Sequence, residues 1–187
     1  MSHSPHGSLH VVPRGARGTV QHYLRDLVYG ANDGIITTFA VVAGVSGGAL
    51  SERVVLIVGA ANLLADGLSM AVGNYLSIRS NESVRRTQGV PEEESQPVRH
   101  ALATLVAFAV VGALPLAPFL VSGLSSQQRF VLSCGATLAA LFGTGASRAS
   151  VTDESWWASG LEMLALGVVV AAVAYGVGLL VAVMVAG

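Results

Sequence analysis

Four side chains with metal-binding atoms follow one another at intervals of four residues in the apolar stretch ANLLADGLSMAVGNYLS. They are Asn62, Asp66, Met70 and Asn74. Residues four apart lie on nearly one face of an α-helix, so the sequence predicts a single polar row. Carboxylate and amide oxygens suit hard cations, and a thioether adds a preference for softer transition metals. The row therefore indicates a site for a divalent ion such as Fe(II), Mn(II) or Co(II).

A second polar patch lies in the preceding apolar stretch, in the motif YGANDGIITT. Asp33 follows Asn32 there, and Thr37 comes one helical turn later. An ionisable side chain inside a membrane-spanning helix costs about 2.5–3.5 kcal/mol on insertion scales. A chain that keeps such groups is expected to use them for cations or protons. We therefore count Asn32 and Asp33 as candidate metal ligands, with the two patches facing each other.

Glu162 is a third carboxylate in an apolar stretch, about one turn from its start. It is a candidate ligand or proton acceptor at the cytoplasmic opening. A purely structural reading stays open for each of these groups. The aspartates can form hydrogen bonds between helices, Met70 can fill a gap in the packing, and Glu162 can pair with Arg148 near the lipid headgroups.

The composition places these groups in a membrane protein. Only 11% of the 187 residues are charged and 52% are hydrophobic, whereas soluble domains have about 25% charged residues. Five apolar segments approach the roughly 20 residues that a helix needs to cross the hydrocarbon core. They lack period-two alternation, so we predict an all-α protein with five transmembrane helices. The predicted spans are residues 27–50, 54–78, 101–122, 130–147 and 157–186.

The remaining residues set the predicted organisation and orientation. Residues 1–24 form a polar tail whose scattered histidines either bind metal weakly or have no specific role, and residues 25–187 form the transmembrane domain. With the N-terminus in the cytoplasm, eight of the ten arginines lie inside and only Arg53 and Arg129 lie outside, as the positive-inside rule expects. Five spans then put the C-terminus outside. The net charge of −1 gives no basic field for nucleic acid.

Small and helix-breaking residues indicate how the helices pack. Gly30 and Gly34 form one small-xxx-small pair and Gly44 and Gly48 another, and such pairs let helices approach closely. The PLAP motif at residues 115–118 is expected to bend or end the third helix. Because five helices with one polar row make a thin wall, we expect a homodimer that encloses a route on its symmetry axis.

Enzyme activity is not expected. The GVSG motif at residues 44–47 imitates a serine-protease motif, but all five histidines lie outside the predicted spans. A membrane serine nucleophile needs such a base beside it. Neither aspartate has the flanking residues of an intramembrane aspartyl protease.

Four segments of the chain, in order, resemble the vacuolar iron transporter family, which includes the yeast vacuolar iron/manganese carrier and nodulin-21-like proteins. They are RDLVYGANDGIITTFAVVAGVSGG, NLLADGLSMAVGNYLSIRSNE, GALPLAPFL and WWASGLEMLALGVVVAAVAYGVG. The resemblance implies a five-helix protomer, a homodimer with the metal path between protomers, and export of Fe(II) or Mn(II) from the cytoplasm in exchange for protons. It also implies that Asp33 and Met70 are metal ligands.

The chain departs from the family pattern in two places. Better-known members have a glutamate where this chain has Asn62, and here the carboxylate stands one turn later at Asp66. Plant members also carry a cytoplasmic metal-binding domain between helices two and three. Here only residues 79–100 connect them, so the chain resembles a short form of the family. We expect Glu92, Glu93 and Glu94 to form a solvated acidic loop.

The functional hypothesis is a transporter in which Asp33 and Asp66, with Met70 and Asn62 as neutral ligands, bind metal or protons alternately. No resident cofactor is expected, since Fe(II) or Mn(II) is the cargo. Two alternatives remain open at this point: a cation channel that works without a proton gradient, and a membrane scaffold subunit that transports nothing. The arginine bias suggests a bacterial inner membrane.

Overall fold

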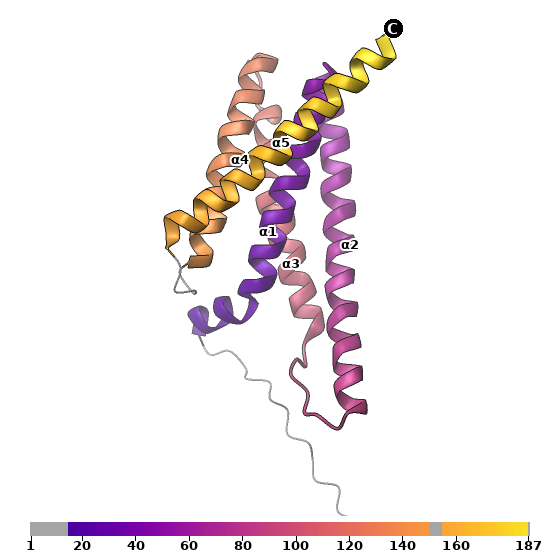
Figure 1. Ribbon diagram of the computed structural model, residues 1–187, viewed down its shortest axis with the longest axis vertical. Coiled ribbons are helices and arrows are strands. Elements are labelled where there is room, and N and C mark those ends of the chain that lie inside the picture. Colours follow the sequence, from indigo (N-terminus) through magenta and orange to yellow (C-terminus); the bar gives the residue numbers. More distant parts are fainter. Residues whose placement is uncertain (1–14, 150–154, 187) are drawn as a thin grey trace, which may run out of the picture.

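The computed structural model describes residues 15–149 and 155–186, which are helical over most of their length (Figure 1). In chain order the elements are α1 (Gly15–Gly47), α2 (Glu52–Thr87), α3 (Pro97–Gly112), the short 3₁₀ helix η1 (Leu114–Leu120), α4 (Ser126–Ala149) and α5 (Trp156–Ala186). No strand occurs in these two ranges, which confirms the all-α class. His3, His6 and His10 of the predicted tail lie outside the described residues.

The described helices match the number of predicted spans. Helices α1, α2, α4 and α5 are each long and apolar enough to cross a membrane, and α3 with η1 forms a bent pair that makes a fifth crossing if the two helices are one span. The pair bends by 42° at Ala113, just before the PLAP segment, which agrees with the bend predicted from the prolines. Ser133 of α4 donates a hydrogen bond of 2.7 Å to the backbone oxygen of Pro115, a carbonyl at this bend. Which side of the membrane each end faces stays a prediction.

Two helices extend well beyond the predicted spans. Helix α1 begins at Gly15, ahead of predicted span 27–50, and α2 continues to Thr87, past predicted span 54–78. Hydropathy locates the part of a helix that meets lipid, whereas backbone hydrogen bonding continues through polar turns. As a result, part of the predicted tail is the first part of α1. The first part of α1, the end of α2 and residues 88–96 together form what we call the loop end of the bundle.

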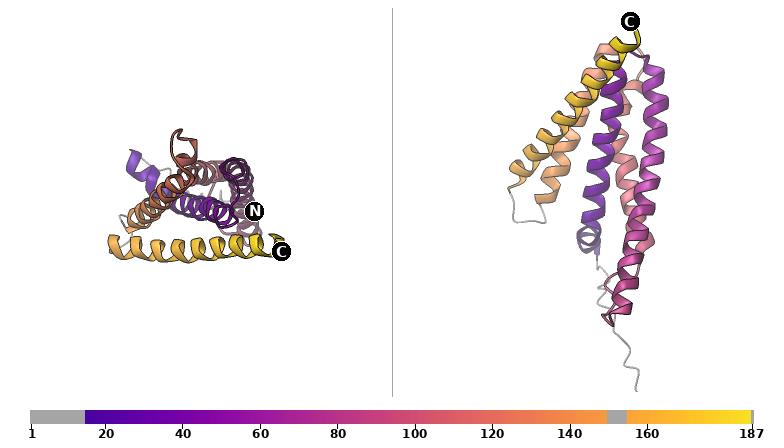
Figure 2. Two further views of the ribbon diagram at one scale, coloured as in Figure 1. Left: turned by 90° about the horizontal axis from the view of Figure 1, so that it is seen from above. Right: turned by 45° about the vertical axis from the view of Figure 1, so that its right-hand side comes forward.

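Helix α1 is the centre of the bundle and contacts every other helix. Helices α2 and α3 pack together on one side of it, and α5 runs obliquely across another side while it also packs on α4 (Figure 2). The buried core includes Ile35 and Val42 of α1, Phe108 of α3 and Leu141 of α4. This arrangement puts the polar residues of α1 next to the polar row of α2.

The predicted glycine contacts occur inside the protomer. A Cβ atom on Gly30 would lie 2.5 Å from the backbone oxygen of Thr104, and one on Gly34 would lie 2.5 Å from that of Phe108. The backbones of α1 and α3 therefore touch, as small residues allow. Gly44 of the second pair is in backbone contact with Gly178 of α5.

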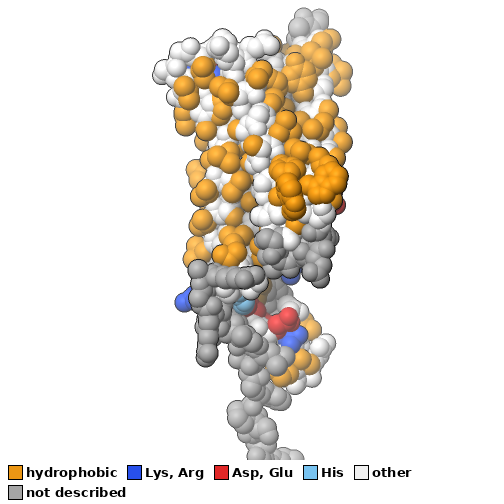
Figure 3. All heavy atoms as spheres, turned by 90° about the vertical axis from the view of Figure 1, so that its left-hand side faces the viewer, with side chains coloured by type: hydrophobic (Ala, Val, Ile, Leu, Met, Phe, Trp, Pro, Cys, Tyr) orange, Lys and Arg blue, Asp and Glu red, His pale blue; other side chains and the backbone are white. Residues whose placement is uncertain are grey.

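The outer surface of the bundle is apolar. Large hydrophobic side chains are exposed along α2, α4 and α5, and Figure 3 shows them spread over the tall helical body, with charged and histidine side chains gathered near the loop end. A soluble protein rarely exposes so large an apolar area. The surface fits a helical bundle surrounded by lipid.

Candidate metal centre

The polar row of α2 lies on one face of the helix, as its spacing predicted. Asn62, Asp66, Met70 and Asn74 are all half-buried in the protomer. Nδ2 of Asn62 donates a hydrogen bond of 3.0 Å to Oδ2 of Asp66, which joins two members of the row. The row therefore lines one side of α2 with side chains that carry oxygen and sulfur atoms.

Asp33 of α1 faces this row. Its carboxylate is half-buried and close enough to that of Asp66 for the two negative charges to repel each other. Nearby charges interact strongly when apolar helices surround them, because the local dielectric constant is low. A cation placed between two such carboxylates would remove their repulsion, so both aspartates stay candidate metal ligands. The structure thus brings together the two aspartates that the sequence analysis placed at the same site.

Thr37 and Asn32, the polar neighbours of Asp33, have different surroundings. The Thr37 hydroxyl donates a 2.7 Å hydrogen bond to the backbone oxygen of Asp33, within α1. Asn32 lies about 100° around the helix from Asp33. It is on the side of Val28 and Ile36, which pack on a cluster containing Leu141. Asn32 thus faces another side of α1 than Asp33 does, and its role as a metal ligand stays a prediction.

Glu162 is also separate from the carboxylate pair. Its Oε2 accepts a hydrogen bond of 2.8 Å from Nη2 of Arg148, which pairs α5 with the end of α4. The Glu162 side chain is 60% exposed. This is the ion pair that the structural alternative anticipated.

Asn74 connects the row to a polar group that the sequence analysis missed. Its Nδ2 donates hydrogen bonds of 2.8 Å to Oδ1 of Asp26 and 2.9 Å to Oγ1 of Thr104, so it joins α2 to α1 and α3. Asp26 is buried, and its Oδ2 lies 2.5 Å from Nδ1 of the buried His100. Asp26 and His100 each stand one residue before a predicted span, so neither was counted among the polar groups inside the membrane. Asp26 precedes Asp33 by seven residues, a spacing that already places both on one helix face.

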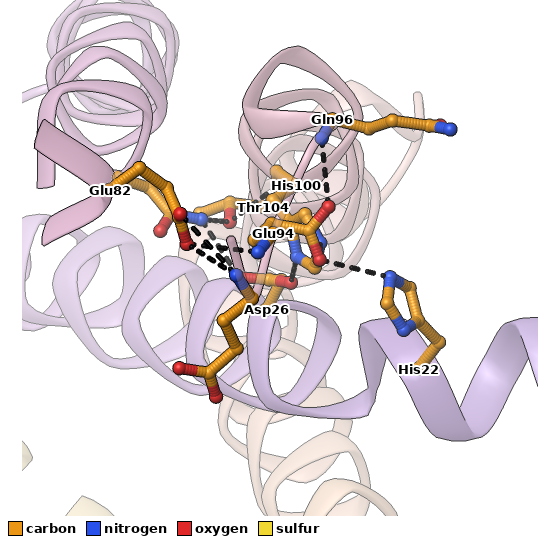
Figure 4. Close-up of polar contacts among 9 residues, drawn as sticks. His22, Asp26, Glu82, Glu94, Gln96, His100 and Thr104 are labelled. Atoms are coloured by element: carbon orange, nitrogen blue, oxygen red, sulfur yellow. Dashed lines mark hydrogen bonds and ion pairs between the residues drawn. The ribbon is translucent and has the colours of Figure 1, made fainter. Parts of the chain in front are cut away.

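The loop end is folded onto the helices, contrary to the expectation of a solvated acidic loop. Glu82 of α2 accepts hydrogen bonds from the backbone N–H groups of Glu93 and Glu94. Glu94 then turns inward, and its Oε2 lies 2.8 Å from Nε2 of His100 (Figure 4). The Glu94 side chain is only 14% exposed. Long-range contacts fix this loop, and no local sequence pattern reports such contacts.

Glu92 and Glu93 are bound by arginines of α2. Nη2 of Arg86 lies 2.5 Å from Glu92, and Nη1 of Arg85 lies 3.1 Å from Glu93. Both pairs are at least partly exposed to solvent. Among the three glutamates of the loop, Glu94 alone points to the histidines in the described structure (Figure 4).

An apolar bundle with paired carboxylates and amides along one internal seam belongs to the class of integral membrane proteins that handle cations. The sequence profile of the VIT family matches residues 24–90 and 81–179, most of the transmembrane region. The chain belongs to this family, the vacuolar iron transporters.

Three relatives show the extent of the similarity. The vacuolar iron transporter of Toxoplasma gondii is 27% identical over 225 residues, which cover 86% of this chain and 74% of the relative. Vacuolar iron transporter homolog 1 of Oryza sativa subsp. japonica is 32% identical over 170 residues, covering 83% of this chain and 72% of the relative. Homolog 2 of the same plant is 28% identical over 170 residues, covering 83% and 88%.

The similarities also agree with a short form of the family. The alignment to the Toxoplasma gondii protein runs over 225 positions, more than the 187 residues of this chain, so that relative contains segments that this chain lacks. The two matched ranges, 24–90 and 81–179, overlap at residues 81–90, at the end of α2 and the start of its connection to α3.

Proposed function

We propose that this chain exports Fe(II) or Mn(II) from the cytoplasm in exchange for protons, with Asp33 and Asp66 as the anionic ligands of the transported ion. The observation that carries the proposal is the electrostatic repulsion between these two half-buried carboxylates, which come from two neighbouring apolar helices. The two negative charges would neutralise a divalent ion held there, so the lipid interior would not face an uncompensated charge. Relatives named vacuolar iron transporters support iron as a cargo.

Neutral ligands next to the carboxylates favour a transition metal over Mg(II) or Ca(II). Met70 stands one turn from Asp66 on the same face, and its thioether prefers softer ions. Asn62 donates to Asp66 through Nδ2, which leaves its amide oxygen as a possible ligand. The resulting donor set of oxygen and one sulfur fits Fe(II) and Mn(II).

Proton exchange follows from the same carboxylate pair. Repulsion between two carboxylates in a low-dielectric setting is relieved either by a divalent ion or by protons. A metal ion binds only to deprotonated carboxylates, so its arrival releases protons and its departure allows them to return. If the site opens to each side of the membrane in turn, metal and protons move in opposite directions.

A homodimer, with the path between protomers, is supported by the surface beside the polar row. Ala61, Ala65, Ser69 and Gly73 follow one another at intervals of four on α2, and all are exposed in the protomer. Such a strip of small residues allows a second helix to approach closely. An α2–α2 contact would bring the polar rows of two protomers together.

Flux measurements on reconstituted protein test the function. Proteoliposomes are given Fe(II), Mn(II), Co(II) or Zn(II), with and without a pH gradient, while internal metal and internal pH are recorded together. The proposal expects Fe(II) or Mn(II) uptake that is coupled to proton movement and slows when a protonophore removes the gradient. Metal flux that ignores the gradient identifies a channel instead, and the absence of flux for every metal identifies a scaffold subunit.

A further inference from the structure

We propose that His22, Glu94 and His100 form a second binding site for a divalent transition-metal ion, at the loop end of the bundle. One nitrogen from each imidazole and one oxygen from Glu94 all lie within 4.8 Å of one another. Nε2 of His22 is 3.4 Å from Oε2 of Glu94, and Nε2 of His100 is 2.8 Å from the same oxygen (Figure 4).

These separations suit a first-row transition metal. A tetrahedral ion with bonds of about 2.1 Å keeps its ligand atoms about 3.4 Å apart, so an ion fits with small adjustments of the side chains. Two imidazoles with one carboxylate are ligands that such ions accept, with the remaining position left for water. The three ligands come from α1, from the loop and from α3, so a bound ion would join three segments.

The orientation of His100 supports this assignment. An ionised Asp26 accepts hydrogen bonds but cannot donate them, so Nδ1 of His100 carries the proton in their 2.5 Å contact. In the neutral ring, Nε2 then presents a lone pair to the carboxylate of Glu94. Two electron-rich atoms 2.8 Å apart repel each other unless a cation, either a proton on the ring or a metal ion, lies between them. A carboxylate behind a histidine is also the usual support of a metal-binding imidazole.

Hydrogen bonds to the other polar atoms of Glu94 fix the orientation of its side chain. Its Oε1 accepts a 2.8 Å hydrogen bond from the backbone N–H of Gln96, and its own backbone N–H donates to Glu82 at 2.9 Å. Oε2 is thereby directed to His22 and His100. Asp26 is fixed in turn by Asn74. The ligands are positioned before any ion arrives.

A cavity of about 430 Å³ gives an ion access to this site. Its lining includes His22, Asn74 and His100, and its charged groups are predominantly acidic. They are Asp26, Glu82, Glu93 and Glu94, with Arg25 as the cation of the lining. Such a lining raises the local concentration of cations over that of anions.

The position of the site suggests that it loads the transport path. Asn74 lines the cavity and is also the last member of the polar row that contains Asp66 and Met70. An ion released from the three ligands would enter beside this row. This role rests on the proposed function, whereas metal binding by the three ligands does not.

Titration of the purified full-length chain in detergent with Co(II) tests the site. Co(II) is chosen because its visible absorption reports its ligands. All samples carry His3→Ala, His6→Ala and His10→Ala, which remove the other N-terminal imidazoles, together with Asp33→Asn and Asp66→Asn, which disable the intramembrane pair. The proposal expects one Co(II) ion per chain, and His22→Gln or Glu94→Gln should weaken its affinity at least roughly tenfold.

Glu92→Gln is the matched control, because Glu92 is on the same loop but is bound by Arg86. It should leave the Co(II) affinity unchanged. If the aspartate replacements prevent folding, the same titrations are made with Asp33 and Asp66 intact, where Glu94→Gln should remove one of two bound equivalents. Two results overturn the proposal: unchanged Co(II) binding in both His22→Gln and Glu94→Gln, or no Co(II) binding in the protein that keeps His22 and Glu94. Either result would leave the cluster as a set of ion pairs that joins the three segments. If the chain binds Co(II) here but transports no metal, the proposed function fails and this inference stands.

Discussion

Nδ1 of His100 lies 2.5 Å from Oδ2 of Asp26, which pairs the first turn of α3 with the central helix α1. The other oxygen of Asp26 accepts a hydrogen bond from Asn74 of α2. This contact therefore stands where the cavity at the loop end meets the polar row of the membrane region. It ties the cavity to Asn74, the last residue of the row that contains Asp66 and Met70.

Replacing Asn74 with leucine should destabilise the bundle. The substitution removes two hydrogen bonds, to Asp26 and Thr104, and leaves both buried groups with fewer partners. We expect the free energy of unfolding to fall by about 1–3 kcal/mol, measured by denaturant unfolding in detergent. Ser77→Ala, on the exposed side of the same helix, is the control and should change little. Equal stability of Asn74→Leu and the unaltered chain would show that these bonds contribute nothing.

Replacing Gly34 with alanine should separate α1 from α3. The added Cβ would lie 2.5 Å from the backbone oxygen of Phe108, and backbone cannot move aside as a flexible side chain does. Overpacking of this kind costs about 1–3 kcal/mol, which a thermal unfolding curve detects. Gly135→Ala is the control, because nothing lies within 4 Å of its added Cβ on α4. If both variants unfold at the same temperature, the close contact of α1 and α3 is not important for stability.

Replacing Met70 with leucine should change metal preference more than total transport. Leucine keeps the volume and the apolar character but removes the sulfur ligand, and softer ions lose most from that. We expect the preference for Fe(II) or Co(II) over Mn(II) to fall roughly tenfold, which corresponds to about 1.4 kcal/mol. Competition between pairs of metals in proteoliposomes measures this ratio. An unaltered ratio would assign Met70 to packing.

Replacing Gly73 with leucine should prevent dimer formation without harming the protomer. Nothing in the protomer lies within 4 Å of a Cβ at this position, yet the position belongs to the strip of small residues beside the polar row. Chemical crosslinking and light scattering in detergent should report monomers. Gly135→Leu, an equally open position on α4, should remain dimeric. A dimer that survives Gly73→Leu would place the interface elsewhere.

The sequence predicted the parts of this structure that depend on helical periodicity and hydropathy. The electrostatic interaction of Asp33 with Asp66 agrees with two polar faces on adjacent helices, and the bend just before the PLAP segment agrees with proline chemistry. Asn32 was grouped with Asp33 because they are neighbours in sequence. One residue is about 100° of rotation on a helix, so neighbours in sequence face different elements.

The loop-end cluster was not predicted, for a physical reason. Its ligands are far apart in sequence, at His22, Glu94 and His100, and they meet only because α1, the loop and α3 pack together. In the sequence, polar residues at a helix end also form the same pattern whether their side chains contact water or one another. Glu94 shows this, since its neighbours Glu92 and Glu93 pair with arginines while it turns inward.

Metal flux through Asp33→Asn and Asp66→Asn variants tests the central claim most directly. Each is reconstituted beside the unaltered chain and beside Glu162→Gln, a carboxylate of α5 that is paired with Arg148 instead. We predict that Fe(II) and Mn(II) flux falls to the level of protein-free liposomes in both aspartate variants, while Glu162→Gln keeps most of its flux. Flux equal to that of the unaltered chain in a correctly folded Asp33→Asn or Asp66→Asn variant would contradict a transport site between these two carboxylates.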